Sequence, residues 1–188
     1  MKKGMKIAIG VVVALLILVV PFISSYNGLI QEESNVDVAW SQVESQLQRR
    51  NDLIPNLVNS VKGAMTQEQT VFGNIADARA KLSGASSVEE KIDANNEMSS
   101  ALSRLLVVVE NYPELKSNEN VTALMDELAG TENRVAVERQ RYNEAVQGYN
   151  NKVKRFPGSI IANITGFEKK PYFKAVEGSE IAPEVNFE

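Results

Sequence analysis

Apolar residues between positions 36 and 65 recur at alternating intervals of four and three, the spacing of one face of a long α-helix. The stripe comprises Val36, Trp40, Val43, Leu47, Ile54, Leu57 and Val61. A heptad stripe of this length packs lengthwise against partner helices. It predicts a helix from about Tyr26 to Met65 at the centre of a helical bundle.

A second stripe with the same spacing predicts a helix that lies beside the first. It comprises Val121, Leu124, Leu128, Thr131, Val135, Glu138, Tyr142, Ala145, Tyr149, Val153 and Phe156. Shorter patterns between the two predict helices over about 66–82 and 87–111, each opened by a capping box, Thr66 with Gln69 and Ser87 with Glu90. The fold class is therefore all-α, an elongated antiparallel bundle of three to four long helices.

Two shorter features complete the bundle. The apolar cluster 105–109 predicts burial on more than one side at the end of its helix. After Pro157 and Gly158 the chain has no sustained period, so residues 158–188 are expected to fold back around Phe167 and Phe173 and to end in a poorly ordered tail.

Two residues break the first stripe. Arg50 occupies a position where Leu is expected, and a buried guanidinium needs a carboxylate. Glu138 of the second stripe or Glu132 beside it can supply one. Pro55 lacks an N–H and should kink or interrupt the helix near residues 52–54. The region is either a kinked core helix with a structural Arg or a binding site.

The candidate interaction residues lie around these breaks and in the second long helix. Tyr-Asn pairs repeat one heptad apart, where they provide either core packing with polar tips or a polar edge for a partner. Charged residues between 132 and 141 form either a solvated face or a binding surface. The full set is Arg50, Asp52, Pro55, Asn56, Glu132, Arg134, Glu138, Arg139, Tyr142, Asn143, Tyr149 and Asn150.

The amino terminus carries a basic start followed by an uncharged apolar run. We predict a transmembrane anchor at 7–25, a bundle domain at 26–157 and an extension at 158–188. A cleaved signal peptide is the alternative, but no A-x-A site follows the run. Lys2, Lys3 and Lys6 precede the run and acidic residues follow it, which predicts a cytoplasmic segment 1–6 and an extracytoplasmic bundle.

Charge and composition narrow the function. Without those three lysines, 17 basic residues remain against 24 acidic ones, a net charge of −7 that disfavours nucleic-acid partners and anionic lipid. The chain has no Cys and no His, so the commonest metal ligands and the commonest general base are missing. No phosphate-binding loop is present. We expect no cofactor, no metal and no catalytic residue.

Several stretches resemble the LemA family. They are Tyr26-Asn27, WSQVESQLQRRNDLIPNLVNSVKG at 40–63, YPELKSNENVTALMDELAGTENRVAVERQRYNEAVQGYN at 112–150, Phe156-Pro157 and GFEKKPYF at 166–173. The resemblance implies an anchored helical bundle and implies no established biochemical activity.

Three functions are compatible with these patterns. The first is a non-enzymatic scaffold or adaptor in the cell envelope, bound to another envelope protein or to a second copy of the chain. The second is a two-state envelope sensor that uses Pro55 as a hinge. The third is a hydrolase with a carboxylate pair drawn from Glu110, Glu132 and Glu138.

Overall fold

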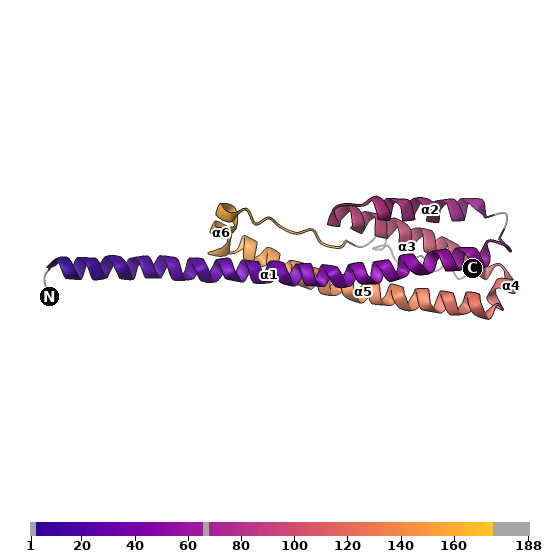
Figure 1. Cartoon of the computed structure of the whole chain (residues 1–188), viewed down its shortest axis with the longest axis horizontal. Helices are drawn as coiled ribbons and strands as arrows, with labels where there is room; N and C mark the ends of the chain where they lie inside the picture. Colours follow the sequence, from indigo (N-terminus) through magenta and orange to yellow (C-terminus); the bar gives the residue numbers. More distant parts are fainter. Residues whose placement is uncertain (1–2, 66–67, 175–188) are drawn as a thin grey trace, which may run out of the picture. The chain divides into compact units, whose positions relative to one another are not determined.

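The computed structural model describes residues 3–65 and 68–174, and this part of the chain contains six helices and no strand (Figure 1). The helices are α1 Lys3–Val61, α2 Gln69–Gly84, α3 Val88–Glu110, α4 Pro113–Lys116, α5 Glu119–Lys154 and α6 Gly158–Thr165. Four of them are long, which confirms the predicted all-α class. The predicted poorly ordered tail lies beyond residue 174, outside the described residues.

The described chain forms two compact units, and both α1 and α5 contribute to each. Unit 1 consists of the residues up to Ser41 together with Gln140–Tyr172. Unit 2 consists of Gln42–Arg139 and the described residues from Phe173 onward. The domain boundaries expected from the sequence, at residues 25 and 157, stay a prediction.

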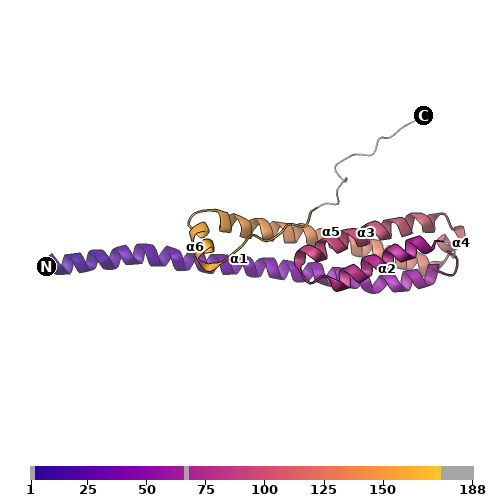
Figure 2. The same cartoon turned by 90° about the horizontal axis from the view of Figure 1, so that it is seen from above.

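Unit 2 is built around the apolar stripe of α1. In both views α2 and α3 lie side by side as an antiparallel pair (Figures 1 and 2). The buried positions of α1 to α5 meet in one core cluster. It contains Ile54, Leu57, Val61, Met65, Ile75, Ala78, Met98, Ala101, Leu102, Leu105, Val109, Leu115, Val121 and Leu128.

The helix starts in unit 2 follow the capping chemistry. Ser87 Oγ accepts a hydrogen bond from the Glu90 backbone N–H at 3.1 Å, and the Glu90 carboxylate accepts one from the Ser87 N–H at 3.2 Å, which confirms the predicted capping box. The Ser86 N–H, the Ser87 N–H and the Ser86 hydroxyl all donate to the Glu90 carboxylate and hold its pKa below its usual range. Asn118 Oδ1 accepts from Asn120 and Val121 and caps α5.

Two expectations for unit 2 are wrong, and a third holds only in part. Helix α2 begins at Gln69 after an N-cap at Glu68 that makes no side-chain cap bond, and Thr66 lies outside the described residues. In the cluster 105–109, Leu105 and Val109 are buried and Val108 packs partly against the core, whereas Val107 is exposed because the helical turn points it away from Leu105. Helix α1 is not interrupted near Pro55, since it continues to Val61.

Unit 1 pairs the first part of α1 with the last part of α5 and with α6 (Figure 2). The Trp40 and Tyr142 rings pack edge to face, with centroids 5.2 Å apart. Phe167 lies 6.0 Å from the Tyr26 ring and packs against the cluster of Leu29, Ile161 and Ala162. The predicted fold-back of the chain at Phe167 is thereby confirmed. In unit 2, Phe173 is likewise buried.

Helix α6 and the end of α5 differ from the prediction. Helix α5 ends at Lys154, and Phe156, assigned from its spacing to the buried stripe, is 81% exposed. Residues 158–165, where no period was apparent, form α6, which ends at Gly166 in the left-handed conformation with φ of 82°. Gly166 donates a backbone hydrogen bond to Ala162.

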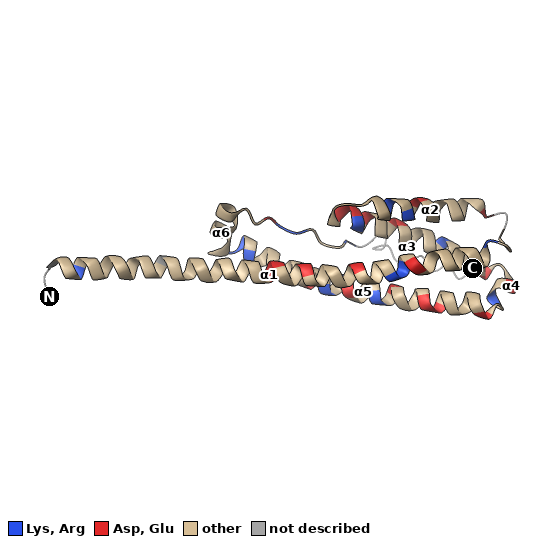
Figure 3. Ribbon diagram, viewed as in Figure 1, with Lys and Arg blue, Asp and Glu red and all other residues tan. Residues whose placement is uncertain are grey.

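The amino-terminal part of α1 is long and apolar enough to cross a membrane. An 18-residue window has a mean hydropathy of 3.0 and none of it is buried within the protein. Figure 3 shows an uncharged run along this part of the helix. By length and composition, this part of α1 is therefore a candidate membrane-spanning helix, as predicted from the sequence.

Candidate functional site

A buried arginine lies at the centre of the polar network in unit 2. Arg50 Nη1 donates to the Glu132 carboxylate and to Ser99 Oγ, both at 2.9 Å, and Nη2 donates to Asn95 Oδ1 at 2.5 Å. Ser99 Oγ in turn donates to Glu132 at 3.3 Å. The network joins α1, α3 and α5, and it confirms the predicted ion pair with Glu132 as the partner.

The two charges of this pair differ in their access to water. The Arg50 side chain is 0% exposed and the Glu132 side chain is 43% exposed. The guanidinium therefore depends on Glu132 for its counter-charge, while Glu132 is already partly hydrated. Arg50 Nε has no hydrogen-bond partner within the described part of the chain. The arrangement neutralises a charge inside the core and binds three helices together.

The other charged candidates are dispersed. Arg139 lies over the Phe173 ring, 4.0 Å from its centroid, and donates to the Lys174 carbonyl at 3.0 Å. Burial lowers the pKa of Arg139, the Glu132 charge opposes this shift and the Arg50 charge adds to it. Arg134 is exposed, and Glu138 is half-buried with interactions of its own.

The candidates that follow Arg50 on α1 do not join its network. Asp52 and Asn56 are exposed, and Pro55 is half-buried in a helix without a break. The Asn56 carbonyl accepts a hydrogen bond from Ser60 Oγ at 2.8 Å. The structure therefore brings Arg50 and Glu132 together, and it leaves the region around Pro55 as a continuous helical surface.

The Tyr-Asn repeat of α5 holds the segment that follows α6 in unit 1. Tyr142 Oη donates to the Pro171 carbonyl at 2.9 Å. Asn150 Nδ2 donates to the Lys170 carbonyl and Asn150 Oδ1 accepts from the Lys170 N–H, both at 2.9 Å. Asn143 is half-buried and also engaged. These side chains satisfy backbone groups of an irregular segment, so their role here is structural.

Both tyrosines of the repeat are hard to ionise. Burial raises the pKa of Tyr142 to about 12, with a smaller effect from the Asp37 carboxylate. Burial also raises the pKa of Tyr149 to about 12, followed by the charges of Glu33, Asp37 and Glu168. Tyr149 Oη is buried and has no hydrogen-bond partner in the described residues.

We expect two of the five tyrosines to titrate near pH 12 in a spectrophotometric titration of the folded chain. An unfolded phenol ionises near pH 10, so between these values the folded state holds more protons and loses stability as the pH rises. Tyr142→Phe and Tyr149→Phe should each remove one high-pH transition. Titration of all five near pH 10 would contradict the burial of both rings.

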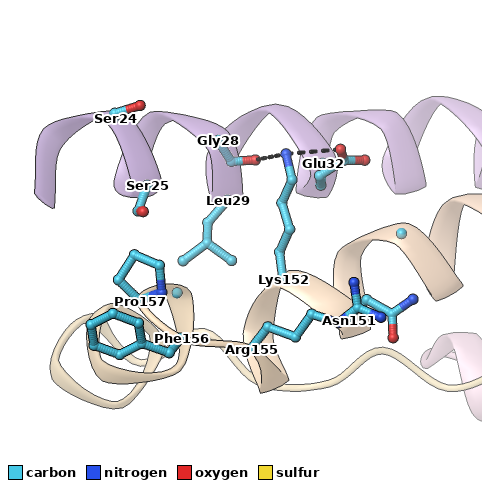
Figure 4. Close-up of a pocket in the computed structure, with 12 residues that line it drawn as sticks. Ser24, Ser25, Gly28, Leu29, Glu32, Asn151, Lys152, Arg155, Phe156 and Pro157 are labelled. Atoms are coloured by element: carbon cyan, nitrogen blue, oxygen red, sulfur yellow. Dashed lines mark hydrogen bonds and ion pairs between the residues drawn. The ribbon is translucent and has the colours of Figure 1, made fainter. Parts of the chain in front are cut away.

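Sequence reasoning missed the ionic contacts of unit 1. Lys152 Nζ pairs with the Glu32 carboxylate at 2.9 Å and donates to the Gly28 carbonyl at 3.2 Å (Figure 4). The Lys152 hydrogen bond lowers the pKa of Glu32, against a smaller opposing effect of burial. Lys170 pairs with Glu33 at 2.9 Å. Only the cluster of acidic residues after the apolar run could have signalled these contacts.

The structure shows the setting of two of the three glutamates considered for a hydrolase. Glu132 is bound to Arg50, and Glu110 is exposed at the end of α3. No group of three or more acidic side chains capable of holding a metal ion occurs within residues 3–65 and 68–174. What the network can do chemically is fix the register of three helices.

Known proteins resemble this chain over most of its length. Magnetosome protein MamQ 2 of Paramagnetospirillum magneticum is 27% identical over 186 residues, which covers 83% of this chain and 68% of that protein. Magnetosome protein MamQ of Magnetospirillum gryphiswaldense is 25% identical over 188 residues, covering 86% and 69%. Protein LemA of Metamycoplasma hominis is 20% identical over 157 residues, covering 83% and 72%.

The LemA family model matches residues 39–187. The matched region contains Arg50 and Glu132 as well as the Tyr-Asn repeat that holds residues 170 and 171. Since the match covers well over half of the sequence, the chain belongs to the LemA family.

Proposed function

We propose that this member of the LemA family is a non-enzymatic scaffold of the cell envelope, anchored by α1 and exposing its bundle outside the cytoplasm. The observation that carries the proposal is the continuity of α1 from Lys3 to Val61. One helix contains the apolar run and the stripe that organises both units. Such a helix couples a folded surface to the bilayer without a linker.

The polar interior supports a structural role for the bundle. The charges of Arg50 and Glu132 pair with each other, and the polar groups of the Tyr-Asn repeat form hydrogen bonds with backbone atoms. Buried polar groups of this kind specify one register among helices that could otherwise slide. A surface held in one register is what a binding partner requires.

Exposed apolar side chains on the long helices are the candidate contact points. Val38 of unit 1 and Val107 and Val137 of unit 2 are each about half exposed or more. Their occupant in this proposal is an envelope protein or a second copy of the chain. Photo-crosslinking residues placed at Val107 and Val137 in cells should give discrete adducts, and a ladder at multiples of the chain mass indicates self-assembly. Absence of adducts at both positions would contradict the scaffold.

The orientation rests on the charges that flank the apolar run. Three lysines precede it, and Glu32, Glu33 and Asp37 are the first charged residues after it. Positive charges are retained on the cytoplasmic side during insertion. The bundle should then lie on the other side of the membrane.

We expect a single Cys at Ser86 to react with a membrane-impermeant maleimide in intact cells. Ser86 is exposed before α3, and the chain has no other Cys. The matched control is Gly4→Cys, on the opposite side of the apolar run, which should react only after lysis. The reverse pattern would place the bundle in the cytoplasm and move the search for partners there.

A further inference from the structure

Helix α6 presents a row of apolar side chains that no residue of the described chain covers. Ile160 is 52% exposed and Ile164 is 68% exposed. They are four residues apart and therefore share one face of the helix. Phe156, four residues before Ile160, is 81% exposed and precedes the same helix. Large apolar groups gathered in this way mark a contact surface.

The opposite face of α6 is fixed to α1. Ile161 and Ala162 are buried against Leu29 in a small core cluster. Figure 4 shows the Leu29 side chain directed at the turn formed by Phe156 and Pro157. Lys152 joins the end of α5 to α1 through the Gly28 carbonyl and Glu32. These contacts hold the exposed row in a defined position beside α1.

That position is close to the end of the apolar run. Leu29 lies four residues beyond Ser25, the predicted end of the membrane-spanning segment, which is about 6 Å along a helix. The headgroup layer on each side of a bilayer is about 5 to 7 Å thick. With the span ending at Ser25, α6, which packs on α1 at Leu29, would lie at the depth of the headgroups.

The charge around α6 suits a membrane surface. Residues 151–172 contain five basic side chains and one acidic side chain, in a chain whose net charge is −4. Two of the five, Lys152 and Lys170, pair with Glu32 and Glu33 of α1. Lys154 and Arg155 are exposed at the end of α5. A hollow of about 480 Å³ beside them is lined by Ser24, Ser25 and Arg155, among others. Basic and hydroxyl groups next to an apolar row are typical of interfacial helices on anionic lipid.

We propose that α6 is a second membrane contact, with Phe156, Ile160 and Ile164 inserted at the interface and the flanking basic residues at lipid phosphates. The occupant is the bilayer that α1 spans, so the proposal rests on that anchoring. The net negative charge of the folded part argued against anionic lipid, but it does not describe this local group of basic residues. Two contacts in place of one would fix the direction in which unit 1 leaves the membrane.

The test uses spin labels on single Cys residues in the full chain, reconstituted into vesicles of phosphatidylcholine and phosphatidylglycerol. Labels at Ile160 and Ile164 are compared with a label at Gln147, an exposed position of α5 in the same unit. A label at Leu16 reports on the apolar run. Collision rates are measured with a water-soluble nickel chelate and with oxygen, which concentrates in lipid.

We expect nickel collisions about five-fold less frequent at Ile160 and Ile164 than at Gln147, with oxygen collisions more frequent. Equal nickel access at all three positions, with Leu16 in lipid, overturns the α6 contact alone. Protection from both reagents overturns it too, because protein then covers the row. If Leu16 is also exposed to water, both the anchor and the α6 contact fail.

Discussion

Glu132→Ala is expected to destabilise the bundle by about 3 kcal/mol, because it leaves the Arg50 guanidinium buried without a counter-charge. This loss of stability is at the lower end for a buried ion pair, because water reaches the Glu132 side chain. Asn95 and Ser99 still accept hydrogen bonds from Arg50 in the variant but supply no charge. Urea unfolding of the full chain in nanodiscs, followed by far-ultraviolet circular dichroism, measures the change.

The chain offers a matched control one residue away. Arg49 pairs with Glu127 at 2.9 Å, and both side chains are about half exposed. Glu127→Ala breaks an ion pair of the same length between the same two helices, and it should cost about 0 to 1 kcal/mol. Equal costs for Glu127→Ala and Glu132→Ala would show that burial of Arg50 adds nothing.

Replacing the arginine itself separates charge from volume. Arg50→Met removes the buried charge and retains an apolar chain of similar length, so it should cost less than Arg50→Ala, which also leaves a cavity. The same unfolding measurement applies. Equal costs of the Met and Ala variants would contradict the explanation by charge.

Gly158→Ala is expected to release α6 from α5 at a cost of about 3 kcal/mol, the upper end for overpacking. A Cβ at Gly158 would clash with the carbonyl oxygen of Lys152, a backbone atom of α5 that cannot rotate away. The turn must open for the methyl group to fit. Hydrogen exchange of the α6 amides in the full chain should become faster, and thermal unfolding should shift to lower temperature.

Gly130→Ala is the matched control for this substitution. Gly130 lies within α5, and nothing stands within 4 Å of a Cβ built there. The variant should be more stable by about 0.5 to 1 kcal/mol, the difference in helix propensity between the two residues. Unchanged α6 exchange in Gly158→Ala would mean that the approach of Lys152 does not constrain the turn.

The long helices could be predicted because their periodicity repeats. Stripes of seven and eleven positions specify helices whatever the local propensity, and Asn95 and Met98 follow the same spacing in α3. Ser87 and Glu90 marked a helix start because both partners of the capping box lie within one turn. Such patterns lie within one segment of the chain, so they can be recognised without knowing which other segments pack against it.

Helix α6 could not be predicted because its order comes from a tertiary contact. Eight residues give two turns, too few for a period, and an isolated helix of that length is unstable in water. Docking of Ile161 on Leu29 stabilises it. Phe156 was assigned to the stripe of α5 for the same reason. That helix ends at Lys154, where the turn that leads into α6 begins.

For the site, the sequence predicted which types of residue pair with each other, but it did not predict which individual residues meet. A buried arginine requires a carboxylate, but Glu132 and Glu138 both lie near the facing stripe, and only helix register selects Glu132. The pairing of Lys152 with Glu32 joins residues 120 positions apart, and no local signal connects them. The interruption expected near Pro55 was wrong because the helix continues through this residue, while a hinge there stays a prediction.

The pairing of α1 with the last part of α5 has a consequence for synthesis of the chain. Trp40 packs on Tyr142, and Leu29 packs on Ile161, so each partner is made more than a hundred residues later. At about 5 to 20 residues per second, the ribosome needs on the order of 5 to 20 s for that interval. During this time the anchor can already be in the bilayer while its apolar stripe waits uncovered at the membrane surface. This interval is the time in which a chaperone of nascent chains could bind the exposed stripe.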